Sequence, residues 1–339
     1  MKKQFWYFIF LLFYIGTLPV QGKITLPAIL SDNMVLQQKA QVRFWGKARP
    51  GEKVTVSTSW DKNIYTVQTP TDGHWEVKIK TPGVMDNQTL TVKGENTITI
   101  HNILIGEVWL CTGQSNMEFP VARDPNVKWK TGILNETEEM KDADYPSIRL
   151  FHVEHQLAPE GEKEDCIGRW LVCTPENVKE FSAVGFIFGR KLYKELQMPV
   201  GLIQSTWGGT HAESWTERRV MKDNPLYADV MEEFAPQNVK REKDKCKVPA
   251  TLWNGMIAPI KGYTIKGNIW YQGLWYLIAF CIVTCIVNSI NCIWVAVAAL
   301  FVPDWLYNIG TTVLNGGVSM VVFFFVNKII FPEGEAKNN

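Results

Sequence analysis

The chain lacks an excess of charge of either sign. Its 339 residues include 35 Lys and Arg against 34 Asp and Glu, which gives a formal net charge of +1 at pH 7. It also lacks a basic run interleaved with aromatic residues, the pattern of many nucleic-acid-binding segments. The sequence therefore predicts no nucleic-acid partner.

Paired CxxC units are absent as well. The seven cysteines stand at positions 111, 166, 173, 246, 281, 285 and 292, whereas finger- or ribbon-type zinc sites need two closely spaced pairs. We predict no metal site and no cofactor. Cys166 and Cys173 are near enough in sequence to bridge across a hairpin, a question that geometry decides.

Tryptophan, by contrast, is plentiful, with 14 residues. Exposed indole faces can stack on sugar rings, but tryptophan also fills ordinary cores. The count therefore favours a glycan ligand only in combination with other features.

Residues 1–22 have the pattern of a signal peptide. Lys2 and Lys3 precede an apolar run from Phe5 to Tyr14, and a small, turn-prone exit follows. The alternative is an uncleaved membrane anchor, but the apolar run is short for a span of about 20 residues. We expect export to the periplasm or the cell surface.

Residues 24–105 contain short alternating segments, which predict strands. Three examples are residues 42–45, 53–57 and 75–79, and Thr71-Asp72-Gly73 is typical of a hairpin turn between two strands. We interpret residues 23–105 as a small antiparallel β-sandwich.

A different pattern begins at Gly106. Val108–Cys111 reads as a buried strand that stops at Gly113 and delivers Ser115 to a turn. A hydroxyl just past a strand end is where α/β hydrolases place a nucleophile, with backbone N–H groups nearby for a developing oxyanion. The alternative is that Gly-Gln-Ser-Asn is only a turn.

Strand and helix patterns then alternate. We predict a helical segment over 136–141, a strand over 147–153, a helix over 181–196 and a strand over 199–205. Such alternation favours a parallel sheet, and ligands gather beyond the carboxyl ends of its strands. The last strand ends at Gly208-Gly209, which we interpret as oxyanion donors, the alternative being a tight loop.

Four blocks of sequence occur in order, GEVWLCTGQSNMEFPV (106–121), FSAVGFIFGRKLY (181–193), PVGLIQSTWGGTHAESWT (199–216) and ATLWNGMIAPIKGYTIKGNIWYQG (250–273). Together they resemble the sialate O-acetylesterase family of SGNH/GDSL-like hydrolases. The resemblance, over residues 24–273, implies a secreted carbohydrate esterase that removes O-acetyl groups through an acyl-serine. It also implies an SGNH-like three-layer α/β/α domain over 106–273.

Within these blocks we identify Ser115 as the candidate nucleophile and the Ser115, Gly208 and Gly209 backbone as candidate oxyanion donors. We predict that the substrate contacts residues beside them, namely Gln114, Asn116, Trp207 and Gln272. His211 replaces the proline usual in the family, and it lies too close to its own loop to serve as a base for Ser115.

The resemblance stops at Gly273. Similar enzymes continue with Glu-Ser-Asn, whose asparagine is a second oxyanion donor, whereas this chain has Leu274-Trp275-Tyr276. The family's Asp-x-x-His segment, which supplies the base, has no counterpart, because no aspartate stands three residues before any histidine. A serine hydroxyl without a base is a poor nucleophile. We therefore expect a truncated catalytic domain with impaired activity.

Residues 274–339 form a hydrophobic tail instead. Two long runs, Leu274–Val302 and Ile309–Phe331, flank a short polar break. The length of the runs favours a helical membrane hairpin through 274–331, and the alternative is buried strands of a core. Thr311–Phe331 also has a weak resemblance to small GtrA-type membrane proteins.

The sequence thus predicts a carbohydrate O-acetylesterase that acts on an acetylated sugar, with an α/β fold and a tail that anchors it to a membrane. Two alternatives remain open. One is a catalytically inactive, membrane-tethered glycan-binding protein. The other is a non-functional gene fusion.

Overall fold

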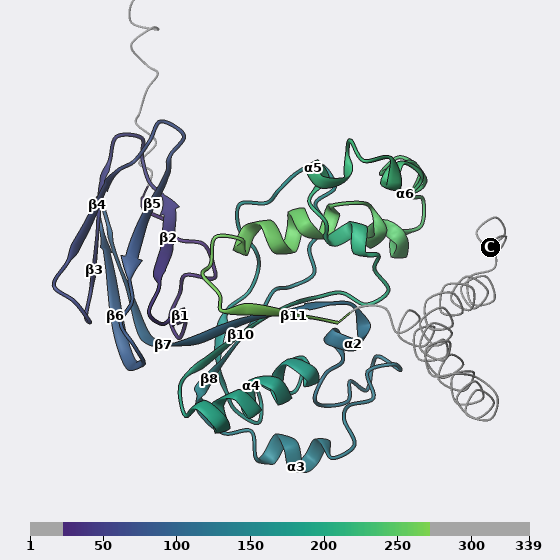
Figure 1. Cartoon of the computed structure of the whole chain (residues 1–339), viewed down its shortest axis with the longest axis horizontal. Helices are drawn as coiled ribbons and strands as arrows, with labels where there is room; N and C mark the ends of the chain where they lie inside the picture. Colours follow the sequence, from purple (N-terminus) through teal and green to yellow (C-terminus); the bar gives the residue numbers. More distant parts are fainter. Residues whose placement is uncertain (1–22, 272–339) are drawn as a thin grey trace, which may run out of the picture. The chain divides into compact units, whose positions relative to one another are not determined.

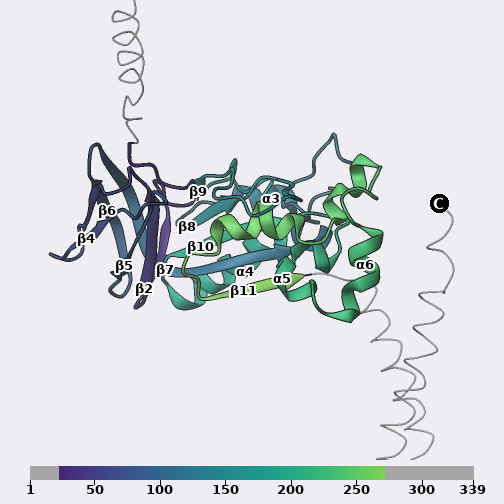
Figure 2. The ribbon, with the colours of Figure 1, turned by 90° about the horizontal axis from the view of Figure 1, so that it is seen from above.

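Strand β7 (Thr97–Gly113) runs through both sheet regions of the molecule (Figures 1 and 2). The structure, a computed structural model, describes residues 23–271. The first half of β7 alternates between exposed and buried positions, and its second half is almost continuously buried. This is the pattern of a strand that leaves a half-exposed antiparallel sheet and enters a parallel sheet covered on both faces.

The other described strands are short. They are β1 (Val35–Gln37), β2 (Gln41–Lys47), β3 (Lys53–Thr58), β4 (Ile64–Gln68), β5 (His74–Lys80), β6 (Met85–Lys93), β8 (Tyr145–His152), β9 (Trp170–Cys173), β10 (Val200–Thr206) and β11 (Gly267–Tyr271).

The α-helices are α2 (Ser115–Glu118), α3 (Glu136–Lys141), α4 (Ala183–Leu196), α5 (Arg218–Met221) and α6 (Ala228–Glu233). The 3₁₀ and π turns are η1 (Ala212–Trp215), η2 (Pro225–Tyr227), η3 (Glu242–Lys247), η4 (Trp253–Ile257) and η5 (Ala258–Ile260).

The first half of the described chain divides its strands between two sheets. β4, β3, β6 and the start of β7 form an antiparallel arrangement, whereas β2 pairs with β5 alone. The buried faces of both sheets belong to one hydrophobic cluster that includes Phe44, Trp75 and Leu90. The β-sandwich over 23–105 stays a prediction, because the same cluster and β7 both continue into the second half.

The prediction of a hairpin at Thr71-Asp72-Gly73 is wrong. Gly73 has a φ of +80°, so a turn is present, but it joins β4 to β5. These strands pair with β3 and β2 respectively and lie in different sheets. The turn therefore carries the chain from one sheet to the other, which its local sequence does not reveal.

The second half is a mixed α/β structure around a large central sheet. Its strand order is β11-β7-β10-β8-β9, parallel except for the β8–β9 pair. Figure 1 shows α3 and α4 on one face of this sheet, and the helical segments of residues 212–260 on the other.

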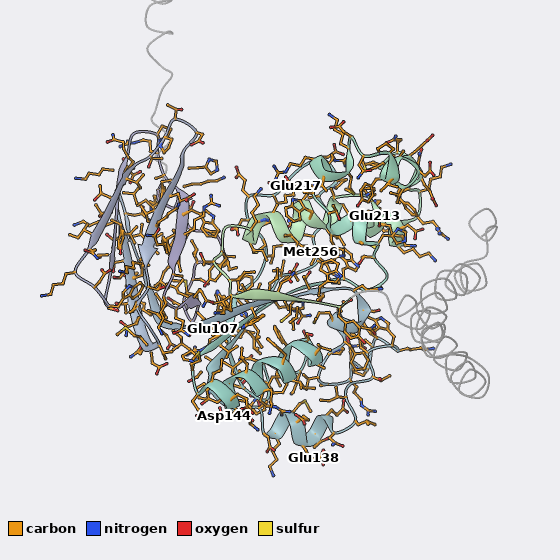
Figure 3. All side chains as sticks on the ribbon, viewed as in Figure 1. Glu107, Glu138, Asp144, Glu213, Glu217 and Met256 are labelled. Atoms are coloured by element: carbon orange, nitrogen blue, oxygen red, sulfur yellow. The ribbon has the colours of Figure 1, made fainter. Side chains whose placement is uncertain are left out.

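Both helical layers contact β10. On one side, the Ser182 hydroxyl caps α4 by accepting from the Gly185 N–H at 3.0 Å, and α4 buries Phe186 and Gly189. On the other, the carbonyl of Met256 (labelled in Figure 3) accepts from the Ser205 hydroxyl at 3.2 Å. β10 is buried along its whole length as a result.

Several predictions concern residues outside the range 23–271. The signal peptide at 1–22, the candidate residue Gln272 and the tail at 274–339 lie outside the described range. Within residues 23–271, none of the helices is both long and apolar enough to cross a membrane. Cys166 and Cys173 are buried free thiols, so no disulfide joins them.

Candidate active site

The carboxyl ends of three parallel strands meet at one level. Thr206 of β10 and Tyr271 of β11 are both in register with Gly113 of β7. Backbone hydrogen bonds continue just past these ends. The Trp207 N–H donates to the Gly113 carbonyl and the Gln114 N–H to the Tyr271 carbonyl, each at 3.2 Å. The loops that follow the strands therefore start side by side.

Gly113 makes the turn that presents Ser115. Its φ is +138°, and a Cβ at this position would collide with the Tyr271 carbonyl, so only glycine fits. The single helical turn α2 starts directly at Ser115, with the Gln114 carbonyl accepting from the Met117 and Glu118 N–H groups at 2.9 Å. Ser115 is half-buried and faces a hollow rather than the core.

The Trp207-Gly208-Gly209 loop lies against this serine. A Cβ added to Gly208 would stand 3.3 Å from the Ser115 Cβ and 3.0 Å from a Glu118 carboxylate oxygen. Gly209 is exposed, with a φ of +72° and open space where a Cβ would be. The two glycines thus serve different purposes. Gly208 allows the loop to approach Ser115 closely, and Gly209 allows a left-handed turn.

Glu118 connects the serine helix to the glycine loop. Its side chain is only 7% exposed, and Oε2 accepts a hydrogen bond from the Gly208 N–H. Burial alone would raise the pKa of Glu118. The hydrogen bond and charge of His155, the Gly208 N–H and the Lys130 ammonium outweigh this effect and hold the pKa below its usual value. Glu118 is consequently ionised at neutral pH.

His155 stands on the other side of that carboxylate. Its Nε2 lies 3.3 Å from Glu118 Oε1 and donates to the Thr206 carbonyl at 3.0 Å. Its ring stacks on Trp207 with centroids 4.0 Å apart and planes inclined by 5°. Because both partners of Nε2 are acceptors, this nitrogen carries a proton, so Nδ1 is the nitrogen that can accept one when the ring is neutral.

These groups surround one hollow of about 560 Å³. Its lining consists of Ser115, Glu118, Val127, Trp129, Lys130, His155, Trp207, Gly208 and Gly209. Within residues 23–271, no group of three or more His, Cys, Asp or Glu side chains is placed to hold a metal ion. The hollow therefore combines a hydroxyl, backbone N–H groups, a buried carboxylate and an imidazole, which are the components of serine-based acyl transfer.

Comparisons with known proteins agree with this arrangement. The family model described as carbohydrate esterase, sialic acid-specific acetylesterase, matches residues 105–274. The sialate O-acetylesterase of Homo sapiens is 36% identical over 268 residues, which cover 72% of this chain and 47% of that protein. The protein of the same name from Mus musculus is 33% identical over 285 residues, with 72% and 50% covered. The chain belongs to the sialate O-acetylesterase family.

A solved relative supports the fold of this family member. The crystal structure of a carbohydrate acetylesterase from Xanthomonas citri superposes with a TM-score of 0.61 at 30% identity, covering 74% of this chain and 51% of that one. The chain spans about half the length of the curated relatives it matches.

The structure brings together four of the predicted site residues. Ser115, Trp207, Gly208 and Gly209 line the same hollow. Gln114 and Asn116 flank Ser115 in the chain but do not line it, and Gln272 follows the described residues. The Gly208 N–H, predicted as an oxyanion donor, already donates to Glu118.

Four residues that line the hollow are not predicted from the sequence, namely Glu118, His155, Lys130 and Trp129. Only Glu118 had a signal, since it stands within the first family block, three residues after Ser115 and thus on the same side of α2.

The other nearby histidines do not reach the hollow. His211 packs its ring edge-on against Phe234 at 4.8 Å and is not among the residues that line the hollow. His152 ends β8, and burial together with the charge of His155 lowers the pKa of His152 to about 4. His152 is therefore a neutral and very weak base at physiological pH.

Proposed function

We propose that this chain is a carbohydrate O-acetylesterase that transfers an acetyl group from a sugar to Ser115 and then to water. The observation that carries the proposal is the close approach of Gly208 to Ser115, where an added Cβ would stand 3.3 Å from the Ser115 Cβ, just past the ends of two adjacent parallel strands. The names of the relatives, sialate O-acetylesterase and carbohydrate acetylesterase, support an acetylated sugar, sialic acid or a related glycan, as the substrate class.

In the proposed mechanism the Ser115 hydroxyl oxygen attacks the acetyl carbonyl carbon. The carbonyl oxygen becomes negative and is held by the Ser115 and Gly209 N–H groups, which donate to no other described residue. The sugar oxygen leaves with a proton, and water then releases acetate from the serine. One such N–H donor can lower the barrier by about 2.7–4 kcal/mol.

The proton of Ser115 needs an acceptor. We propose His155, the histidine in the lining of the hollow, as the base in this chain, with Glu118 holding the Nε2–H and leaving Nδ1 free to accept. The sequence has no Asp-x-x-His segment to do the same work. We therefore expect turnover well below that of an esterase with a dedicated base.

The test is hydrolysis by the full chain of p-nitrophenyl acetate and of O-acetylated sialic acid. Ser115→Ala should abolish turnover, and His155→Ala by itself should lower turnover severalfold relative to the wild type. Ser147→Ala, a serine on β8 away from the hollow, is the matched control and should retain activity. Turnover that persists in Ser115→Ala would exclude the acyl-serine mechanism.

Retained sugar binding without turnover would instead support the inactive glycan-binding alternative, and aggregation would support the non-functional fusion. We further propose that residues 1–22 direct export and that 274–331 tether the chain to a membrane. Cell fractionation with a carbonate wash tests both statements, since a tethered chain stays in the membrane pellet.

A further inference from the structure

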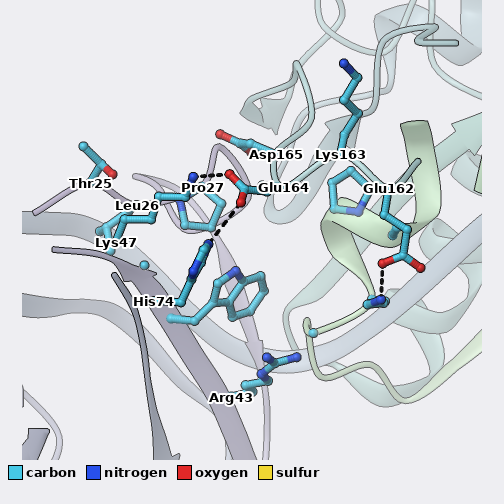
Figure 4. Close-up of a pocket in the computed structure, with 16 residues that line it drawn as sticks. Thr25, Leu26, Pro27, Arg43, Lys47, His74, Glu162, Lys163, Glu164 and Asp165 are labelled. Carbon is cyan, nitrogen blue, oxygen red and sulfur yellow. Dashed lines mark hydrogen bonds and ion pairs between the residues drawn. The ribbon is translucent and has the colours of Figure 1, made fainter. Parts of the chain in front are cut away.

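A second hollow, of about 540 Å³, lies far along the chain from the Ser115 site. It is formed by β2, β5 and the segments around residues 25–27, 162–165 and 258–262 (Figure 4). It shares no lining residue with the hollow around Ser115. Its volume falls within the range of about 300–1,000 Å³ that is typical of small-molecule sites.

Part of the lining of this hollow is apolar. Leu26, Pro27 and Pro259 belong to this part, together with Trp45. The Arg43 guanidinium lies over one face of the Trp45 ring, 5.4 Å from the ring centroid, and Gly262 packs close to the ring, where a Cβ would stand 3.3 Å from it. The ring is therefore fixed in place before any ligand arrives, which lowers the entropic cost of binding.

The rest of the lining, which we call the rim, carries charged side chains, and most of these are paired with one another. Glu164 pairs with Lys47 and with His74 Nε2, the latter at 3.2 Å (Figure 4). On the opposite side Glu162 pairs with Lys261 at 2.5 Å. These side chains remain 38–60% exposed, so their unused donor and acceptor positions face solvent.

We propose that this hollow binds a neutral sugar unit of a glycan, at a site separate from the esterase site. A sugar ring has an apolar face that fits a fixed indole, and hydroxyl groups at its edge that both donate and accept. The carboxylates of the rim accept from such hydroxyls and the ammonium groups donate to them. A neutral ligand is favoured over an anion because three of the four Lys and Arg side chains in the lining, Arg43, Lys47 and Lys261, already have carboxylate partners.

The experiment measures binding of methyl β-galactoside, N-acetylglucosamine and N-acetylneuraminic acid to the full chain by saturation-transfer NMR and calorimetry. Binding of at least one neutral sugar is expected at millimolar concentration, with N-acetylneuraminic acid weaker at this site. Trp45→Ala should weaken that binding about tenfold, the effect of removing one good stacking contact. Lys261→Ala, an exposed rim change, should weaken it severalfold without risk to folding.

Trp129→Ala is the matched control, because Trp129 lines the Ser115 hollow and is 44% exposed. It should leave binding of the neutral sugar unchanged. Loss of binding in Trp129→Ala but not in Trp45→Ala would place the sugar at the esterase site and overturn the proposal. Failure of every neutral sugar to bind, or a Trp45→Ala substitution that weakens the acidic sugar more than the neutral ones, would overturn it as well. These readouts need no turnover and are independent of the esterase proposal.

Discussion

Gly208 and Gly209 are adjacent, yet substitution to alanine should affect them differently. A Cβ at Gly208 meets Ser115 and Glu118, whereas Gly209 has open space and only its φ of +72° opposes a side chain. Gly208→Ala should therefore lower kcat/KM for p-nitrophenyl acetate about 100-fold, since it displaces Ser115, the proposed nucleophile. Gly209→Ala keeps its N–H and should cost about 1 kcal/mol of stability with little loss of activity.

Gly161→Ala is the control for both variants, because a Cβ there contacts nothing and φ is ordinary. Activity and urea denaturation are measured on all three proteins. Equal activity losses in Gly208→Ala and Gly209→Ala would contradict the distinction between close approach and turn.

Glu118 should make the stability of the protein depend on pH. Because the folded pKa of this carboxyl is depressed, its ionised form stabilises the fold at pH values above the unfolded pKa, and the contribution is lost as pH falls through the folded pKa. Glu118→Ala leaves the Gly208 N–H without its acceptor and His155 Nε2 with only the Thr206 carbonyl, and should cost about 1–3 kcal/mol near neutral pH.

Urea unfolding of the wild type, Glu118→Ala and the exposed control Glu160→Ala at pH 7, 5 and 3 measures this effect. The gap between wild type and Glu118→Ala should narrow on acidification from about pH 5 downward. A gap that is constant with pH would show that the charge of Glu118 is unimportant.

The sequence predicted that Ser115 and the glycine loop lie together, but not what surrounds them. Ser115 and Gly208 each follow a strand end, a local signal that places them at one sheet edge. His155 carries no such signal, because it meets Glu118 across 37 positions of chain and is held by the ring of Trp207. Contacts of this kind depend on how loops fold back, which local patterns do not encode.

At the level of elements, packing and helix propensity have opposite effects on stability at one position of helix α4. Gly189 faces the sheet, and a Cβ there would stand 2.5 Å from a Leu202 methyl on β10. Helix propensity alone predicts that Gly189→Ala stabilises by about 1 kcal/mol. Overpacking against a fully buried strand opposes this gain and typically costs about 1–3 kcal/mol.

We therefore expect Gly189→Ala to lower the free energy of unfolding, measured by urea denaturation, despite the better helix former. Ile187→Ala, on the exposed side of the same helix, should change it by less than about 0.5 kcal/mol. A more stable Gly189→Ala protein would show that α4 shifts away from β10 without cost.

Periodic elements were predictable, and connections between sheets were not. The helix expected over 136–141 is α3, and the strand over 199–205 is β10 within one residue. The turn at 71–73 does not join two paired strands, because β4 pairs with β3 and β5 pairs with β2. Which strands pair depends on packing between segments distant in sequence. The 3₁₀ and π turns of residues 212–260 lack a period long enough to recognise.

For residues 23–271 as a whole, β7 and one hydrophobic cluster join the two halves. The cluster extends from Phe44 and Trp75 to Phe151 and Trp170, which belong to opposite sides of the predicted boundary at residue 106. Hydrogen bonds cross the same boundary, since the Trp170 indole donates to the Ile29 carbonyl at 2.8 Å. Neither half can lose its strands without exposing part of a shared core.

These residues should accordingly unfold in a single transition. Gly106 stands at the middle of β7, where a Cβ would collide with the Pro199 carbonyl, and Gly106→Ala should cost about 1–3 kcal/mol. Native-state hydrogen exchange should show the same loss of protection in β3 as in β10, with Gly161→Ala unchanged. Protection lost in β10 but kept in β3 would instead mean that the first half folds by itself, as a β-sandwich of residues 23–105 would. The shared core makes the joint loss the expected result, because the collision at Gly106 disturbs the strand on which both sheets are built.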